Sequence, residues 1–250
     1  MTRVTALLVA GSVMWTCAGC SGLAGALGFG GRKTIPANET VKHAVEAVGG
    51  LKAWRSAGTI RADAVVTLYD EAGVAAVNRH EQRINLHRGR LWASARVPEG
   101  QWSAGTDDWG NVRFDAGGAD LPAALKGRLL ASLGTMLHRL RGPMNLCGYG
   151  ETPGPGRPVR VDGVDLVRVA AAGGHADVKA YYFDAGSRRL RFVTAGADRP
   201  GEDGTVTVYD YETFPNGMAM PARLSVVKIG EHVLLGDQPV LQVRYSNVRF

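Results

Sequence analysis

Histidine, cysteine and paired acidic residues are the side chains of this sequence that could do chemistry. His80 and His87 lie seven residues apart on one expected strand, and an odd separation puts them on opposite faces, which disfavours a shared metal site. Cys147 could act as a nucleophile with His138 as its base, but no pattern in the sequence brings the two together. We interpret Cys147, which follows an expected helix, as a small buried hydrophobic residue.

Acidic residues gather in two expected turns, at Asp107-Asp108 and between Asp198 and Asp203. Paired carboxylates can transfer protons, but acidic residues in turns are usually solvated. The glycine-rich segments lack the spacing and the strand-to-helix context of phosphate-binding loops, and no Gly-x-Ser-x-Gly motif is present. We therefore expect no enzymatic activity, no cofactor and no metal.

The N-terminus carries the most specific pattern in the chain. Arg3 is followed by the uncharged run 4–15, which is shorter than the roughly 20 residues that span a bilayer and suits a signal peptide. Ala18 and Gly19 then precede Cys20. This segment resembles the lipobox of bacterial lipoproteins, although Cys17 stands where Leu is commonest.

The lipobox resemblance implies cleavage before Cys20 and acylation of its sulfur, with palmitate as the expected acyl group. Two acyl chains give stable anchoring where one is marginal. Residues 1–19 are then a signal peptide and residues 20–37 a lipidated, flexible tether. Because Ser21 follows the cysteine, we expect the outer membrane, with the protein facing the periplasm. The alternative is an ordinary secretory signal that is cleaved elsewhere.

Charge and cysteine content limit the partners. The formal charge is +6, and loss of Arg3 with the signal peptide leaves +5 (6 − 1). The basic residues are scattered, so a solvated surface is favoured over an anionic membrane surface, and no nucleic-acid partner is expected. Cys147 remains as the free thiol, which rules out an intramolecular disulfide. We expect a monomer.

The pattern after the tether predicts a helix and then many strands. Asn38 can cap a helix with an apolar stripe at Val41, Ala44, Val45 and Val48, which Gly49-Gly50 ends. From Gly58 the period changes to two and short turns follow, which is typical of an antiparallel meander. The expected strands are 59–69, 74–86, 90–97, 101–106, 111–115, 159–161, 165–171, 178–184, 188–195, 205–213, 222–229 and 240–250.

A second helix is predicted over residues 121–141. Asp120 can cap it, Pro122 suits its first turn, and the helix ends near Gly142-Pro143. We expect its apolar face to exclude His138 and the basic residues Lys126, Arg128 and Arg139. Residues 148–158 are expected to form a loop. The apolar face comprises Leu121, Leu125, Leu129, Leu133, Met136, Leu137 and Leu140.

The order of these features resembles the periplasmic lipoprotein carrier and localisation-factor (LolA/LolB-like) superfamily. The resemblance covers residues 38–250. It is carried by Gly49-Gly50 with Leu51 and Trp54 before a long strand, the helix at 121–141, the strand pair around Tyr181-Tyr182-Phe183-Asp184, and the C-terminal run from Val208 to Val248. It implies a mainly β (α+β) fold, an unclosed antiparallel half-barrel of about 11 strands whose concave face is covered by two helices.

The resemblance also implies a membrane-anchored envelope lipoprotein that binds acyl chains of a lipid or lipoprotein, as part of their sorting. The alternative is a structural or interaction lipoprotein with a filled core and no small ligand. The residues expected to line a ligand cavity, or to form ordinary core, are Leu125, Leu129, Leu133, Met136, Trp92, Trp102, Tyr181, Phe183, Tyr209 and Tyr211.

Overall fold

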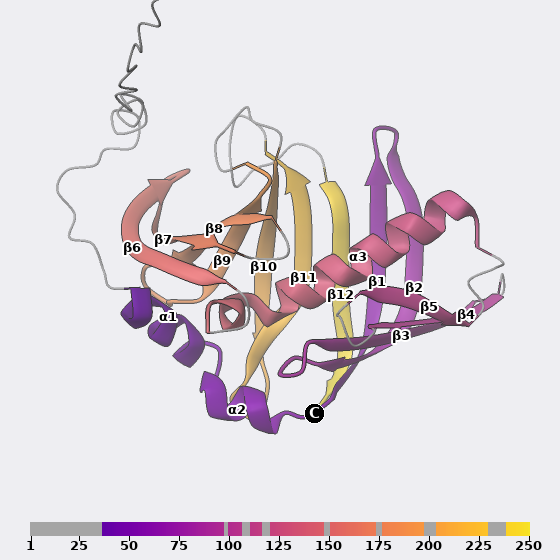
Figure 1. Cartoon of the computed structure of the whole chain (residues 1–250), viewed down its shortest axis with the longest axis horizontal. Coiled ribbons are helices and arrows are strands. Elements are labelled where there is room, and N and C mark those ends of the chain that lie inside the picture. The colour runs from indigo at the N-terminus through magenta and orange to yellow at the C-terminus, as the bar shows by residue number, and fades with distance from the viewer. Residues whose placement is uncertain are drawn as a thin grey trace, which may run out of the picture.

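The computed structural model describes residues 37–97, 100–106, 111–116, 121–147, 151–173, 177–197, 204–229 and 239–250. In this part of the chain one antiparallel sheet of 12 strands has the order β5-β4-β3-β2-β1-β12-β11-β10-β9-β8-β7-β6 (Figure 1). The first strand pairs with the last, and β5 and β6 form the two edges, so the sheet is unclosed. The expected mainly β half-barrel is confirmed.

The strands follow the chain in a meander. Their bounds are β1 Ile60–Asp70, β2 Gly73–Asn85, β3 Arg90–Val97, β4 Gly100–Thr106, β5 Val112–Ala116, β6 Thr152–Val161, β7 Val164–Ala172, β8 Val178–Asp184, β9 Leu190–Ala195, β10 Thr205–Thr213, β11 Ala219–Lys228 and β12 Pro239–Arg249.

Alternating hydrophobicity explains which side of the sheet is buried. In β1, Ile60, Ala62, Ala64, Val66 and Leu68 are all buried, whereas the residues between them are exposed or half-buried. Successive side chains of a strand point to opposite faces, so one apolar face results. The curvature of the sheet makes this its concave face (Figure 1).

Helices lie against the concave side and along one end of the sheet. The long helix α3 (Ala123–Arg141) crosses the concave face diagonally, while α1 (Ala37–Glu46) and α2 (Gly50–Ser56) lie below β6 and near the C-terminus (Figure 1). A short 3-10 helix, η2 (Gly142–Leu146), follows α3 directly. The expected cap Asp120 lies outside the described residues, and Pro122 takes the N-cap position.

The expectation that residues 148–158 form a loop is wrong from residue 152 onward. Strand β6 begins at Thr152 and pairs with β7, with a register shift between Pro153 and Gly156. Proline cannot donate to a strand ladder, so it is tolerated at an edge, where one side of the strand needs no partner. The glycines and prolines from Pro153 to Pro158 belong to an irregular edge strand.

Two hydrophobic clusters stabilise the fold. The larger joins α1, α2 and α3 to the concave face. The smaller lies on the other face of β6–β11 and contains Tyr182 stacked on Phe192, with ring centroids 4.2 Å apart. Strands β8 and β9 are therefore buried on both faces, which is why they are almost continuously apolar.

The junction between α1 and α2 requires a glycine. Gly49 has φ 104°, and a Cβ placed there would lie 2.9 Å from the carbonyl oxygen of Gly217. The adjacent Val48 carbonyl accepts hydrogen bonds from the Ala219 N–H at 3.1 Å and from the Trp54 indole at 2.9 Å. The two helices are thus held against the turn between β10 and β11.

We expect Gly49→Ala to lower the free energy of unfolding by about 2 kcal/mol or more, because the substitution combines a left-handed backbone with a steric clash. The matched control is Gly127→Ala in α3, where a Cβ meets nothing within 4 Å. The control should raise stability by about 0.5–1 kcal/mol, because alanine favours the helix. Urea denaturation measures both changes, and equal effects would contradict the assigned role of Gly49.

Candidate ligand-binding cleft

A cleft of about 710 Å³ lies between α3 and the sheet. It is at the end of β1 and β12 that holds Leu68 and Leu241, away from the end where Arg61 pairs with Arg249. Its volume is within the roughly 300–1,000 Å³ typical of small-molecule sites. The described lining residues are Leu68, Arg128, Ala131, Ser132, Thr135, Arg139, Asp177, Ala195, Gly196, Gly204, Thr205, Val226, Lys228, Ile229, Val240 and Leu241.

The two walls of the cleft differ in character. The helix wall is a polar stripe of Arg128, Ser132, Thr135 and Arg139, which the helical repeat places along one flank of α3. The sheet wall is mainly aliphatic, with Leu68 of β1, Val226 of β11, and Val240 and Leu241 of β12. The cleft therefore offers an apolar surface opposite a row of hydrogen-bonding and cationic groups.

Arg139 is the unusual member of the helix wall. It is only 5% exposed, and its Nε and Nη1 atoms have no hydrogen-bond partner. The expectation that Arg139 lies away from the packed side of the helix is wrong. Because α3 lies across the sheet, the packing reaches the end of the polar flank and buries the Nε and Nη1 atoms of this guanidinium.

Two buried hydroxyl groups of β10 lie on the same side of the sheet. Thr207 and Tyr209 are 0% and 1% exposed, and their hydroxyl oxygens have no partner. Burial raises the pKa of Tyr209, and the positive charge of Arg139 opposes that shift while the charge of Glu151 adds to it. Arg139 is thus close enough to Tyr209 for its charge to act on the phenol.

A buried polar network holds the C-terminal end of α3. His138 Nε2 lies 2.9 Å from Glu151 Oε1, and the Asn145 side chain donates to the His138 carbonyl at 2.9 Å and to the Tyr181 hydroxyl at 3.3 Å. The network joins α3 and η2 to β8 and to the residue before β6. It positions the helix end that carries Arg139.

The suggested pair of Cys147 with His138 is not formed. The imidazole of His138 contacts Glu151, whereas the Cys147 thiol is directed at the Pro143 carbonyl, 3.8 Å away. Burial raises the pKa of Cys147, which keeps the thiol protonated and weakly nucleophilic.

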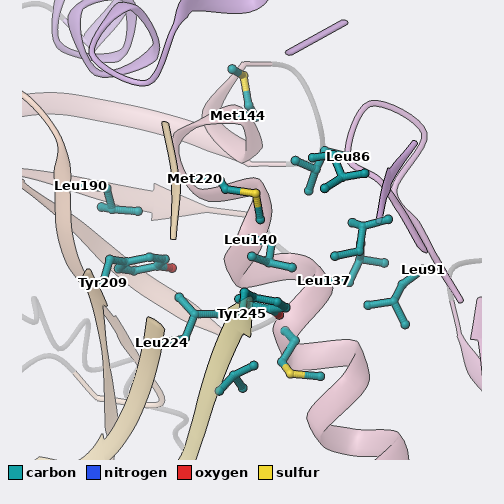
Figure 2. Close-up of a cluster of buried hydrophobic side chains, with 14 of the residues drawn as sticks. Leu86, Leu91, Leu137, Leu140, Met144, Leu190, Tyr209, Met220, Leu224 and Tyr245 are labelled. Atoms are coloured by element: carbon teal, nitrogen blue, oxygen red, sulfur yellow. The ribbon is translucent and has the colours of Figure 1, made fainter. Parts of the chain in front are cut away.

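Most of the residues expected to line a cavity lie in the closed core instead of the cleft. Figure 2 shows part of this core, where Tyr209, Leu224 and Tyr245 of the sheet lie beside Leu137 and Leu140 of α3. Leu125 and Tyr211 are partly buried against it. The buried members of the expected set are Leu129, Leu133, Met136, Trp102, Tyr181, Phe183 and Tyr209.

Trp92 is separated from the other members of that set. Its strand neighbours Leu91 and Ala93 are buried on the concave side, so the alternation of the strand puts Trp92 on the opposite face. There the guanidinium of Arg83 lies 4.8 Å from the centroid of the Trp92 ring. The expectation that Trp92 and Trp102 line one cavity is therefore wrong, because adjacent strands do not imply a shared face.

His80 is a buried concave-face residue. Its Nε2 lies 2.8 Å from the Gln82 amide nitrogen, and its ring centroid lies 5.3 Å from that of Trp102. Nδ1 has no partner, and burial lowers the pKa of His80 from 6.5 to about 4. His87 lies beyond the end of β2 at Asn85, which corrects the expectation of one strand for both histidines.

Asp107-Asp108, the acidic segment from Asp198 to Asp203, and Cys20 lie outside the described residues. Within the described ranges, no group of three or more His, Cys, Asp or Glu side chains could hold a metal ion. In that same part of the chain, no helix combines the length and the hydrophobicity that a membrane crossing requires.

Comparison with solved structures identifies the fold. The LolA superfamily protein NE2245 from Nitrosomonas europaea is 11% identical, with a TM-score of 0.51 over 86% of this chain and 94% of that one. This likeness shows that the chain has a LolA-like fold, as the sequence pattern predicts.

Two further structures are similar over comparable lengths. A DUF1329 family protein from Desulfovibrio piger is 12% identical, with a TM-score of 0.44 over 87% of this chain and 94% of that chain. A putative outer membrane lipoprotein-sorting protein domain from Vibrio parahaemolyticus is 12% identical, with a TM-score of 0.43 over 86% and 93%. No family model and no curated protein matches the sequence.

We expect the buried imidazole of His80 to make folding sensitive to acid. The unfolded chain takes up a proton near pH 6.5 and the folded chain only near pH 4, so stability falls as the pH is lowered through this window. The contribution is up to about 3 kcal/mol. In urea denaturation from pH 7 to 4, the difference in unfolding free energy between wild type and His80→Gln should therefore change with pH. The exposed control His87→Gln should show the same pH dependence as wild type. Parallel curves for all three proteins would refute the assignment.

Proposed function

We propose that this chain is a membrane-anchored envelope lipoprotein that binds a hydrophobic ligand, the acyl chain of a lipid or lipoprotein, and serves in the sorting of such molecules. The observation that carries the proposal is the cleft of about 710 Å³ between α3 and the aliphatic sheet wall. The LolA-like fold supports the proposal, because a ligand can bind between an open sheet and the helix that covers it. We place the protein at the outer membrane, facing the periplasm.

Ligand binding also suggests a movement of α3. Leu129 and Leu133 are 0% exposed, so they and the buried aromatic residues of the sheet can meet an acyl chain only if the helix shifts. The polar network at Asn145 and Glu151 holds the C-terminal end of α3, while Ala123 and Ala124 at its start are exposed. We therefore propose that the N-terminal half of α3 moves and that its C-terminal end is the pivot.

The second candidate is a structural or interaction lipoprotein with no small ligand. The closed packing of Leu129, Leu133 and Met136 against the sheet favours it, because a permanently filled core needs no ligand. The two functions differ in whether the purified protein takes up an acyl probe.

A binding experiment separates the two functions. A chain that begins at Ser21 keeps every residue of both hydrophobic clusters. We expect it to bind a fatty acid that carries a terminal fluorophore. Ala131→Trp, an exposed residue of the cleft wall, should weaken binding about tenfold by filling the cleft.

The matched control is Ala124→Trp, which is exposed on the same helix but lies outside the cleft lining and should leave the affinity within about twofold. Fluorescence titration measures all three proteins. No uptake by the unmodified chain would favour the ligand-free function, and equal losses in both variants would remove the cleft as the site.

The anchor is tested through the cysteines of the N-terminus. Cells that express the full chain and are fed alkyne-labelled palmitate should incorporate the label into the protein, and Cys20→Ser should abolish it because the thioether can no longer form. Cys17→Ser and Cys147→Ser are the matched controls and should retain the label. Label that persists in Cys20→Ser would contradict lipidation at this position.

A further inference from the structure

Arg139 has two guanidinium donors that no group in the described structure accepts from. Burial costs a charged group its hydration, and only a hydrogen-bonded partner replaces that loss. Its Nε and Nη1 donors are unsatisfied while the residue is 95% buried, because only 5% is exposed. Unsatisfied buried charges are costly, and such a group calls for a partner.

Two acidic side chains lie near the cleft, and their recorded contacts are with residues other than Arg139. Asp177, the one acid among the described lining residues, lies 2.6 Å from Lys179. Glu151 contacts His138 through Oε1 at 2.9 Å, and its buried Oε2 has no hydrogen-bond partner. Arg128 and Lys228 add two further cations to the lining, so the cleft has an excess of positive charge beside its aliphatic wall.

The positions of these groups define an amphiphilic site. Arg139 follows Ser132 and Thr135 on the flank of α3 and interacts with Tyr209, whose hydroxyl also lacks a partner. Leu68, Val226, Val240 and Leu241 form the opposite wall. A ligand with an apolar chain and one anionic group would satisfy both walls, whereas a neutral hydrocarbon would leave the guanidinium unpaired.

We propose that Arg139 binds the anionic head group, a carboxylate or phosphate monoester, of a single-chain amphiphile whose chain lies along Leu68, Val226 and Leu241. This inference rests on the proposed binding of acyl chains and adds the chemistry of the head group. Arginine presents paired N–H donors that match both carboxylate and phosphate oxygens, and such charge-assisted bonds are stronger than neutral ones.

The test uses the chain that begins at Ser21 and three probes with the same chain length: dodecanoate, dodecyl phosphate and neutral 1-dodecanoylglycerol. In isothermal titration calorimetry the unmodified chain should bind at least one anionic probe about tenfold more tightly than the neutral one. Arg139→Gln should remove that preference and leave the affinity for the neutral probe within about twofold. Arg244→Gln, which removes an exposed arginine of β12 outside the described cleft lining, is the matched control and should keep the preference.

Thermal unfolding distinguishes a binding role from a structural one. Without ligand, Arg139→Gln should unfold at the same or a higher temperature than the unmodified chain, because an unpaired buried charge is removed. A clear loss of stability would show that Arg139 supports the fold and would overturn the proposal.

The remaining outcomes separate this inference from the proposed function. An unchanged preference in Arg139→Gln, or equal binding of all three probes by the unmodified chain, overturns the head-group proposal and leaves acyl-chain binding intact. Failure to bind any probe overturns the proposed function itself. Inorganic phosphate and acetate serve as chain-free ligands, and binding as tight as that of the dodecyl probes would show a simple anion site and contradict the amphiphile.

Discussion

The open sheet must have its concave face covered, and the rest of the structure depends on how α3 does this. A closed barrel would satisfy its own interior, but here β5 and β6 stay unpaired with one another and the apolar face would meet water without a helix. Leu129, Leu133 and Met136 supply the cover. Because the contact is between a helix and a curved sheet, it fills the centre and leaves a cleft along one flank of α3.

The same contact gives α3 two different sides. Its apolar side completes the core, and its polar flank, from Ser132 to Arg139, faces the cleft. Packing that stabilises the first side also buries Arg139 at the edge of the second, and it leaves the Nε and Nη1 donors without partners. A buried guanidinium without partners lowers the stability of the ligand-free fold. Natural proteins keep such destabilising groups where a functional site needs them. In the proposed function, stability and ligand binding are therefore linked through one helix.

The sequence predicted most of the elements because their patterns are local. The alternation of β1 and the spacing of leucines in α3 depend only on the pitch of each element, and both are found in the structure. The segment 148–158 was harder, because glycine and proline favour a loop until the pairing of β6 with β7 places them at an edge. The expectation for Trp92 was wrong for another reason: the alternation of β3 places it on the face opposite Leu91 and Ala93, and the register with β4 pairs it with Gly105 instead of Trp102.

What the sequence by itself determined is the mainly β class and the long helix between two sets of strands, whereas lipidation at Cys20 remains a prediction. Only the tertiary structure decided which polar residues became buried. Arg139 lies at an ordinary polar position of an amphipathic helix, and no local pattern distinguishes it from Arg128. Its 5% exposure arises from the way α3 lies across strands that are distant in the chain, and such long-range packing leaves no local signature.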